Sequence, residues 1–497
     1  MRTTDLYTSK VSALCENNPS FQQFAESIAK QARTSLRDRY LPQDFLKHVE
    51  ESYQLIKHDT YLQIQATEKG VVVHSIMTDQ PFIVDTLRMH LNAFGAISTL
   101  GYNAVISITE DGFGIPTNKD DNTKSVIRFD VLFTNPPNVE EMQQVIEQKL
   151  NLAKYVVSDF QYMTSLLEQS IKQFERSRVK NVELEPIYKE CSDFISWLLQ
   201  DNFVFMGMEH QTQASNELLG VGQEDVIETL GSGLDTYREW NPDYGDSEIP
   251  ISVRKSHLES PVHRLGQIDE IHIALSENQG FIKILGLFTH RAVTQLSRRV
   301  PLLRRTLAYI LQDDNSQPSS YRYKGICNVF DSLPTEFLFT AKPELLGQII
   351  DRILDAEQDQ EPRTKVVRTE RSDNSFVVVA IPQGLWNDDL RHNIKDILME
   401  ETQATYCDSG VFVGRYNTVL AHYFLTGNQK LDREDNKRIE ALITDRCTRW
   451  ENRVLQILTQ NLGETEADRI FRIFGSNIQS SYKKYRPLQE VCEDFCT

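Results

Sequence analysis

The chain has 497 residues, of which 40% are hydrophobic and 25% charged, and its formal net charge at pH 7 is −18. This length exceeds what one hydrophobic core can organise and indicates about three or four domains. The negative charge disfavours sequence-independent nucleic-acid binding. No run of eighteen apolar residues occurs, and the seven cysteines include no CxxC pair. We therefore predict a cytoplasmic protein with reduced thiols, no membrane span and no nucleic-acid partner.

The N-terminal part predicts a helical cap followed by an α/β domain. In residues 1–58, two sets of apolar residues recur at helical spacing: Phe21, Phe24, Ile28 and Ala32, then Phe45, Val49, Tyr53 and Ile56. Residues 59–155 show the order strand, strand, helix, strand, strand, helix. This order predicts a small α/β sandwich with an extra hairpin strand.

The centre of that sandwich is the stretch 76–95, where a β-branched strand turns into a helix. We expect Pro81 at the first helical position and Gly95 just after the helix end. Asp79 is expected either to cap the helix N-terminus or to contact a ligand. The apolar stripe of the helix consists of Val84, Leu87, Leu91 and Phe94.

The remaining chain predicts further domains joined by helices. The first α/β domain is expected to end with a helix over 138–152. Residues 156–200 are expected to form a helical spacer, with one helix over 155–178 and another that starts after Pro186. Residues 201–357 are expected to form a second α/β domain with a loop-rich middle at 220–246. Residues 358–430 are expected to form a third, and 431–497 to be helical. The strand and helix order of the first domain recurs from 364 to 461, which indicates an internal repeat.

The search for catalytic motifs is negative. No complete GxGxxG follows a strand, and no P-loop, HExxH or GxSxG occurs. We therefore assign no catalytic residue, no cofactor-binding residue and no metal ligand. His257 and His263 stand near Arg254, Lys255 and Arg264, a group that suits either an anion site or a solvated basic rim.

The central stretch also carries a family resemblance. Asp79, Pro81, Phe82, Val84 and Asp85 stand in the order of the D-x-P-F-x-V-D signature of large bacterial NAD-dependent glutamate dehydrogenases. Further stretches that resemble this family follow in the same order: FVFMG (203–207), GLFT (286–289), VPLLRR (300–305), YKGICNVFDSLPTEFLF (323–339) and the chain from Trp450 onward. The resemblance covers roughly residue 60 to the C-terminus.

The resemblance implies an α/β (α+β), multi-domain chain of repeated ACT-like, ferredoxin-like βαβ sandwiches joined by helical spacers. It also implies an N-terminal regulatory and assembly region, whose catalytic region, in cis or as a separate chain, uses NAD for amino-acid catabolism. On this basis we expect a homo-oligomer that is inactive alone and binds an amino-acid effector at Asp79, Gln80, Phe82 and Asp85. The alternative is a free-standing amino-acid-sensing or scaffold protein. The packed character of residues 482–497 favours a fragment, a split gene product or a truncated enzyme.

Overall fold

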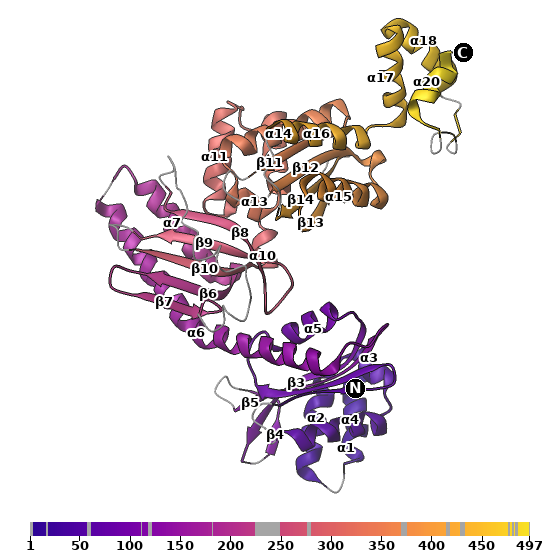
Figure 1. Ribbon diagram of the computed structural model, residues 1–497. Coiled ribbons are helices and arrows are strands. Elements are labelled where there is room, and N and C mark those ends of the chain that lie inside the picture. Colours follow the sequence, from indigo (N-terminus) through magenta and orange to yellow (C-terminus); the bar gives the residue numbers. More distant parts are fainter. Residues whose placement is uncertain are drawn as a thin grey trace. The chain divides into compact units, whose positions relative to one another are not determined.

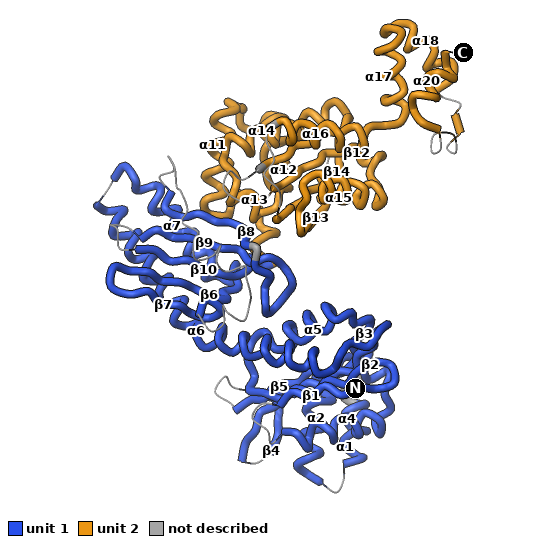
Figure 2. The backbone as a smooth tube through the Cα atoms, in the orientation of Figure 1, with its two compact units in different colours: residues 1–289 blue, residues 290–497 orange. Residues whose placement is uncertain are grey.

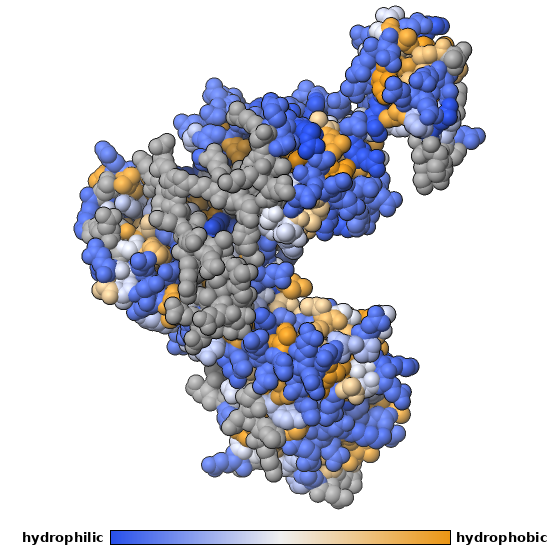
Figure 3. Space-filling model, in the orientation of Figure 1, coloured by the Kyte–Doolittle hydropathy of each residue, from blue (hydrophilic) through white to orange (hydrophobic). Residues whose placement is uncertain are grey.

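The computed structural model describes residues 3–15, 18–56, 61–110, 112–117, 122–180, 182–223, 249–275, 280–368, 375–413, 418–427, 433–475, 478–479, 482 and 486–496. The chain separates into two compact units, Met1–Thr289 and His290–Thr497 (Figure 2). Within the described ranges, no helix has both the length and the apolar character that crossing a membrane requires. The described surface on the side shown in Figure 3 is mostly hydrophilic, with apolar residues in small groups.

The first unit begins with helices packed on an antiparallel sheet (Figure 1). The cap contains α1 (Thr3–Ala13), α2 (Pro19–Gln31), α3 (Thr34–Arg39) and α4 (Pro42–Leu55). The sheet has the order β1-β2-β5-β3-β4 and consists of β1 (Tyr61–Ala66), β2 (Gly70–Thr78), β3 (Ala96–Thr109), β4 (Gly112–Gly114) and β5 (Thr123–Phe133). Its other face is covered by α5 (Ile83–Ala93) and the start of α6 (Val139–Lys180).

Both faces of this sheet are buried, because successive residues of a strand point to opposite faces. Val126 on β5 packs with the cap helices, together with Tyr102 and Ile106 of β3. Phe129 and Val131, of opposite parity on β5, pack with α5 and α6. The cap therefore adds a third layer to the predicted sandwich.

The second part of the first unit is another antiparallel sheet, covered by helices. α6 packs against α7 (Glu185–Trp197), which continues through the π-helical turn η1 (Leu198–Asn202). The sheet order is β7-β6-β10-β9-β8, with β6 (Phe203–Gln211), β7 (Asn216–Gly220), β8 (Ile251–Glu259), β9 (Gln267–Ala274) and β10 (Phe281–Phe288). The rings of Trp197 and Phe288 lie 6.0 Å apart, and those of Phe160 and Phe205 6.2 Å apart, so both helices contact the sheet through aromatic side chains.

The second unit begins with short helices and then forms its own sheet. The helices are α10 (His290–Val293), η4 (Ser297–Arg299), α11 (Leu303–Asp313), α12 (Tyr321–Ser332), α13 (Thr335–Thr340) and α14 (Pro343–Asp359). The strands of this sheet are β11 (Arg363–Arg368), β12 (Ser375–Pro382), β13 (Tyr406–Val413) and β14 (Thr418–Thr426). The helices η5 (Gln383–Leu385) and α15 (Asp388–Thr402) follow β12, and α16 (Arg433–Cys447) follows β14. The chain then forms α17 (Trp450–Leu462), α18 (Glu464–Phe474) and α20 (Leu488–Cys496), which share a separate apolar cluster.

The predicted repeat is confirmed by the sheet topology. The order β11-β12-β14-β13 in the second unit matches the order β1-β2-β5-β3 in the first, and all neighbouring strands are antiparallel. In each repeat the helix after the second strand, α5 or α15, contributes to the core over one face of the sheet. The chain is thus a mixed α/β protein with more than one sheet, as predicted.

Two details of the secondary structure differ from the expectations. The separate helices expected over 138–152 and 155–178 are wrong, because α6 runs without interruption from Val139 to Lys180. Strand β7 was not expected. The second of the two compact units begins at His290 and contains the helices from 290 to 357, and the second domain predicted from the sequence spans 201–357. Most of the loop-rich segment expected at 220–246 lies outside the described residues.

Candidate functional site

The candidate site is the turn between β2 and α5, which contains the four residues expected to bind an effector. The backbone N–H of Asp79 donates to the Thr123 carbonyl at 3.1 Å, and the Ser125 hydroxyl donates to Asp79 Oδ1 at 2.7 Å. Asp79 is therefore tied to strand β5. The expected helix cap by Asp79 is wrong, since α5 begins only at Ile83 and no side chain caps it. Pro81 accordingly precedes the helix and does not form its first residue.

Phe82 occupies the N-cap position of α5 in a left-handed backbone conformation. Its φ angle is 75°, which costs free energy for a residue with a bulky side chain and persists only where the surroundings enforce it. The Phe82 side chain packs against the apolar cluster of the second sheet, which includes Val262 and Leu287. Its ring also meets the His263 ring edge-on at 5.5 Å. Packing against the second sheet therefore offsets the backbone strain at this turn.

The N-terminus of α5 presents unused hydrogen-bond donors. In the part of the chain that the structure describes, the N–H groups of Ile83, Val84 and Asp85 have no acceptor, and the first intrahelical bond runs from Thr86 N to the Phe82 carbonyl at 3.0 Å. Gln80 Nε2 is buried and likewise lacks an acceptor there. Free N–H groups at the positive end of a helix dipole suit a carboxylate.

Asp85 supplies a negative charge beside these donors. Its side chain is 59% exposed, and its Oδ2 lies 3.4 Å from His263 Nδ1, in an orientation that makes no hydrogen bond. Burial lowers the pKa of His263, and the nearby Asp85 carboxylate offsets this shift only in part. His263 is therefore neutral at pH 7, and the Asp85 carboxylate stays open to a cationic group such as an ammonium.

The loop after β8 holds α5 from the side of the second sheet. The backbone N–H of His263 donates to Oγ1 of Thr86, a fully buried residue, at 3.2 Å. His90 Nε2 lies 3.1 Å from the Pro261 carbonyl, which requires a proton on that nitrogen. Burial lowers the pKa of His90 as well, which favours the neutral tautomer that donates this bond. A ligand at the β2–α5 turn would therefore touch a helix that both sheet domains hold.

The basic residues near His263 are largely engaged within the protein. Arg254 Nε lies 2.5 Å from Glu270 Oε2, Lys255 Nζ lies 2.7 Å from Asp269 Oδ1, and Arg264 Nη2 donates to the Phe288 carbonyl at 2.9 Å. These contacts do not leave an open anion site at the three cations, and Arg264 remains exposed, as the alternative of a solvated rim expects. The side chain of His257 lies outside the described residues.

One polar cluster was missed by the sequence interpretation. Arg128 on β5 is 4% exposed beneath the cap, and its guanidinium donates to Glu51 Oε2 at 2.9 Å and to Asp130 Oδ2 at 2.7 Å. His74 of β2 lies beside Glu51, and burial lowers its pKa to about 4. The sequence contained one indication of this cluster: the polar residues His74, Arg128 and Asp130 lie within largely apolar strands. No group of three or more His, Cys, Asp or Glu side chains in the described chain is arranged to hold a metal.

Comparisons with known proteins identify the relatives of the chain. Residues 300–359 match the family model of glutamate dehydrogenase helical motif 1, and residues 366–451 match that of the glutamate dehydrogenase ACT2 domain. The chain is 25% identical over 449 residues to an NAD-specific glutamate dehydrogenase of Halomonas elongata, and 22% identical over 445 residues to one of Pseudomonas aeruginosa. Each match covers 84% of this chain and 27% of the relative.

These matches concern the second and the third predicted domain. The segment 300–357, which the sequence placed in a second α/β domain, matches a helical motif. The third predicted domain matches an ACT domain, and its sheet β11-β12-β14-β13 lies within or next to the matched residues.

Proposed function

Because the chain is a distant homologue of a region of NAD-specific glutamate dehydrogenases and matches their helical motif 1 and ACT2 domain, we propose that it is the N-terminal regulatory and assembly region of such an enzyme. The main support for this proposal is the similarity over 449 residues, together with a sheet topology that occurs twice in the chain. The catalytic region, with which the chain would act in cis or as a separate protein, would oxidise L-glutamate with NAD to 2-oxoglutarate, ammonium and NADH.

An affinity tag placed in this chain tests the proposal in its source organism. The turn between β6 and β7 is exposed at Ala214 and suits an insertion, because such hairpin tips tolerate added residues. We expect the material isolated through this tag to form NADH from NAD only when glutamate is present. The recombinant chain alone should form none, since it carries no recognisable nucleotide fingerprint. Tagged material that never shows glutamate-dependent NADH formation would contradict the proposal.

We further propose that an amino acid binds at the β2–α5 turn. Its carboxylate would face the free N–H groups of Ile83 and Val84, its ammonium would pair with Asp85, and Phe82 would cover its apolar side. Gln80 would donate its unused amide hydrogen to the carboxylate. Asp79 contributes by holding the turn on β5 through Ser125.

A thermal-shift screen of the twenty amino acids checks this site. We expect at least one to raise the melting temperature, because a ligand at a hundredfold its dissociation constant adds about 2.7 kcal/mol to the free energy of unfolding. Asp85→Asn should abolish the shift in the melting of the first unit, which contains this turn, without lowering the melting temperature of the free protein. Asp44→Asn, a change at another exposed carboxylate of the same unit, should leave it intact. A shift of the first unit that survives Asp85→Asn would contradict binding at the β2–α5 turn.

Self-association is part of the proposed assembly role. β13 is an edge strand, and its consecutive residues Val411, Phe412 and Val413 are 41%, 43% and 59% exposed. Open apolar edges of this kind pair readily with another strand. We expect the chain to be larger than a monomer by light scattering at micromolar concentration, and Phe412→Lys to shift the mass toward the monomer. A monomeric wild-type chain would place the subunit contacts outside this sequence.

A further inference from the structure

A small cavity, open to solvent, lies in the second unit between α14 and β11. Its volume is about 260 Å³, and it is lined by Gln348, Asp351, Arg352, Asp355 and Lys365. The first four residues are spaced by three, one and three positions on α14, which places them on one side of the helix. The opposite side is buried and consists of Leu346, Ile349, Ile350, Ile353 and Ala356. The buried side of α14 therefore holds the four lining residues of this helix in place over β11.

The charged groups of this cavity are only partly neutralised within the protein. Arg322 Nη2 lies 2.7 Å from Asp351 Oδ1, and Lys365 Nζ lies 3.2 Å from Glu440 Oε1. Arg352 and Asp355 are three residues apart on one helix and of opposite charge, yet no ion pair joins them to each other or to any other described residue. Lys365 retains donors, because an ammonium has three and Glu440 takes one.

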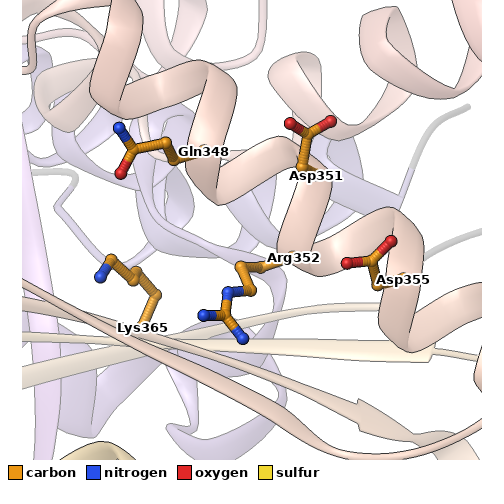
Figure 4. A pocket seen from close by; sticks show the side chains of 5 residues that line it. All are labelled: Gln348, Asp351, Arg352, Asp355 and Lys365. Carbon is orange, nitrogen blue, oxygen red and sulfur yellow. The ribbon is translucent and has the colours of Figure 1, made fainter. Parts of the chain in front are cut away.

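Opposite charges occupy different sides of the cavity. Figure 4 shows the Arg352 guanidinium and the Lys365 ammonium on one side, and the Asp351 and Asp355 carboxylates on the other. A free anion would be attracted by the first pair and repelled by the second, and a free cation would meet the reverse. A ligand with an anionic and a cationic group a short distance apart can place each group beside side chains of the opposite charge and so avoids both repulsions.

We propose that this cavity binds a small zwitterion of the α-amino acid class. The ligand carboxylate pairs with Arg352, in the bidentate geometry that guanidinium groups favour, and with Lys365. The ligand ammonium pairs with Asp355, while Gln348 donates or accepts through its amide. A volume of about 260 Å³ lies below the range of drug-sized pockets and suits a molecule of this size.

Occupancy of this cavity would connect two segments of the chain. Arg352 and Asp355 belong to the helical-motif match that ends at 359, whereas Lys365 directly precedes the ACT2 match that begins at 366. A zwitterion bound to all three would restrain α14 against β11, one of the two edge strands of the sheet. This site is separate from the one proposed at the β2–α5 turn and does not depend on it.

Isothermal titration of the full chain with each of the twenty amino acids tests the inference. Two probes serve as controls that carry charges of one sign only: 2-oxoglutarate, which lacks an ammonium, and putrescine, which lacks a carboxylate. All titrations are made in the Asp85→Asn background, so that the site at the β2–α5 turn contributes nothing. We expect at least one amino acid to bind, and neither control to bind with comparable affinity.

Variants of the lining residues then locate the bound amino acid. Arg352→Met and Asp355→Asn should each weaken binding roughly tenfold or more, because each removes one charged partner. Arg472→Met, at an arginine of the same unit whose side chain is 82% exposed, should leave the affinity unchanged. Because Arg352 and Asp355 are exposed, melting temperatures of the free variants should match the wild type. Equal binding of 2-oxoglutarate, no amino-acid binding, or affinity unaffected by Arg352→Met would overturn the inference.

Discussion

The double variant Glu51→Gln, Asp130→Asn should lower the free energy of unfolding of the first unit by about 3–5 kcal/mol. The two substitutions remove both carboxylates that pair with the Arg128 guanidinium and leave it 4% exposed without an opposite charge. Removing the charged partners of a buried ion is costly because the remaining charge stays desolvated. Hydrogen exchange of the β5 amides should accelerate roughly a hundredfold or more.

Two controls separate this effect from a general loss of packing. Asp44→Asn removes an exposed ion pair with Lys47 on the same helix as Glu51, and we expect a change below about 0.5 kcal/mol. Adding Arg128→Met to the double variant should restore part of the stability, because an apolar side chain of similar length needs no partner. If the triple variant is less stable than the double variant, the account of Arg128 as an unpaired buried charge is wrong.

Glu357→Gln should stabilise the second unit near pH 8 and leave it almost unchanged near pH 5. Burial raises the pKa of this carboxyl from its ordinary 4.5 to about 7. Between these two values the folded chain holds a proton that the unfolded chain has released, so stability falls as the pH rises toward 7 and remains reduced above it. The loss is about 1–2 kcal/mol after allowance for partial exposure, and glutamine avoids it.

Melting temperatures of the wild type and the variant across this pH range measure the effect. The difference between them should be small near pH 5, grow through pH 7, and then stay constant. Glu361→Gln, at a side chain 53% exposed just beyond the same helix, should show no such trend. A difference between wild type and Glu357→Gln that is independent of pH would mean that Glu357 ionises normally in the folded chain.

Local sequence patterns predicted much of the architecture, because alternation and helical spacing directly reflect which face of an element is buried. The stripe of Leu87 and Leu91 is buried on α5 as expected, and the strand order of the first domain recurs in the second unit. The exact helix start was missed. Phe82 adopts a left-handed conformation that no local propensity favours and that contacts with the second sheet enforce.

The candidate site could be predicted only in part. Its own residues are close in sequence, and the family resemblance is what grouped Gln80, Phe82 and Asp85 at the strand-to-helix turn. Their neighbour His263 is 178 residues from Asp85 along the chain, and only the fold brings the two together. Arg128, Glu51 and His74 likewise converge from three elements. The length of α6 was missed because its apolar pattern passes from the core of one sheet to that of the next.

The rate of glutamate-dependent NADH formation by the complex isolated through the tag at Ala214 tests the central claim most directly. It should be measured with and without the amino acid that stabilises the chain, in the wild type and in Asp85→Asn. The account predicts activity in both complexes and a several-fold change of rate on adding the amino acid, in the wild type alone. A complex whose activity is the same with and without every amino acid that binds the chain would contradict the regulatory role.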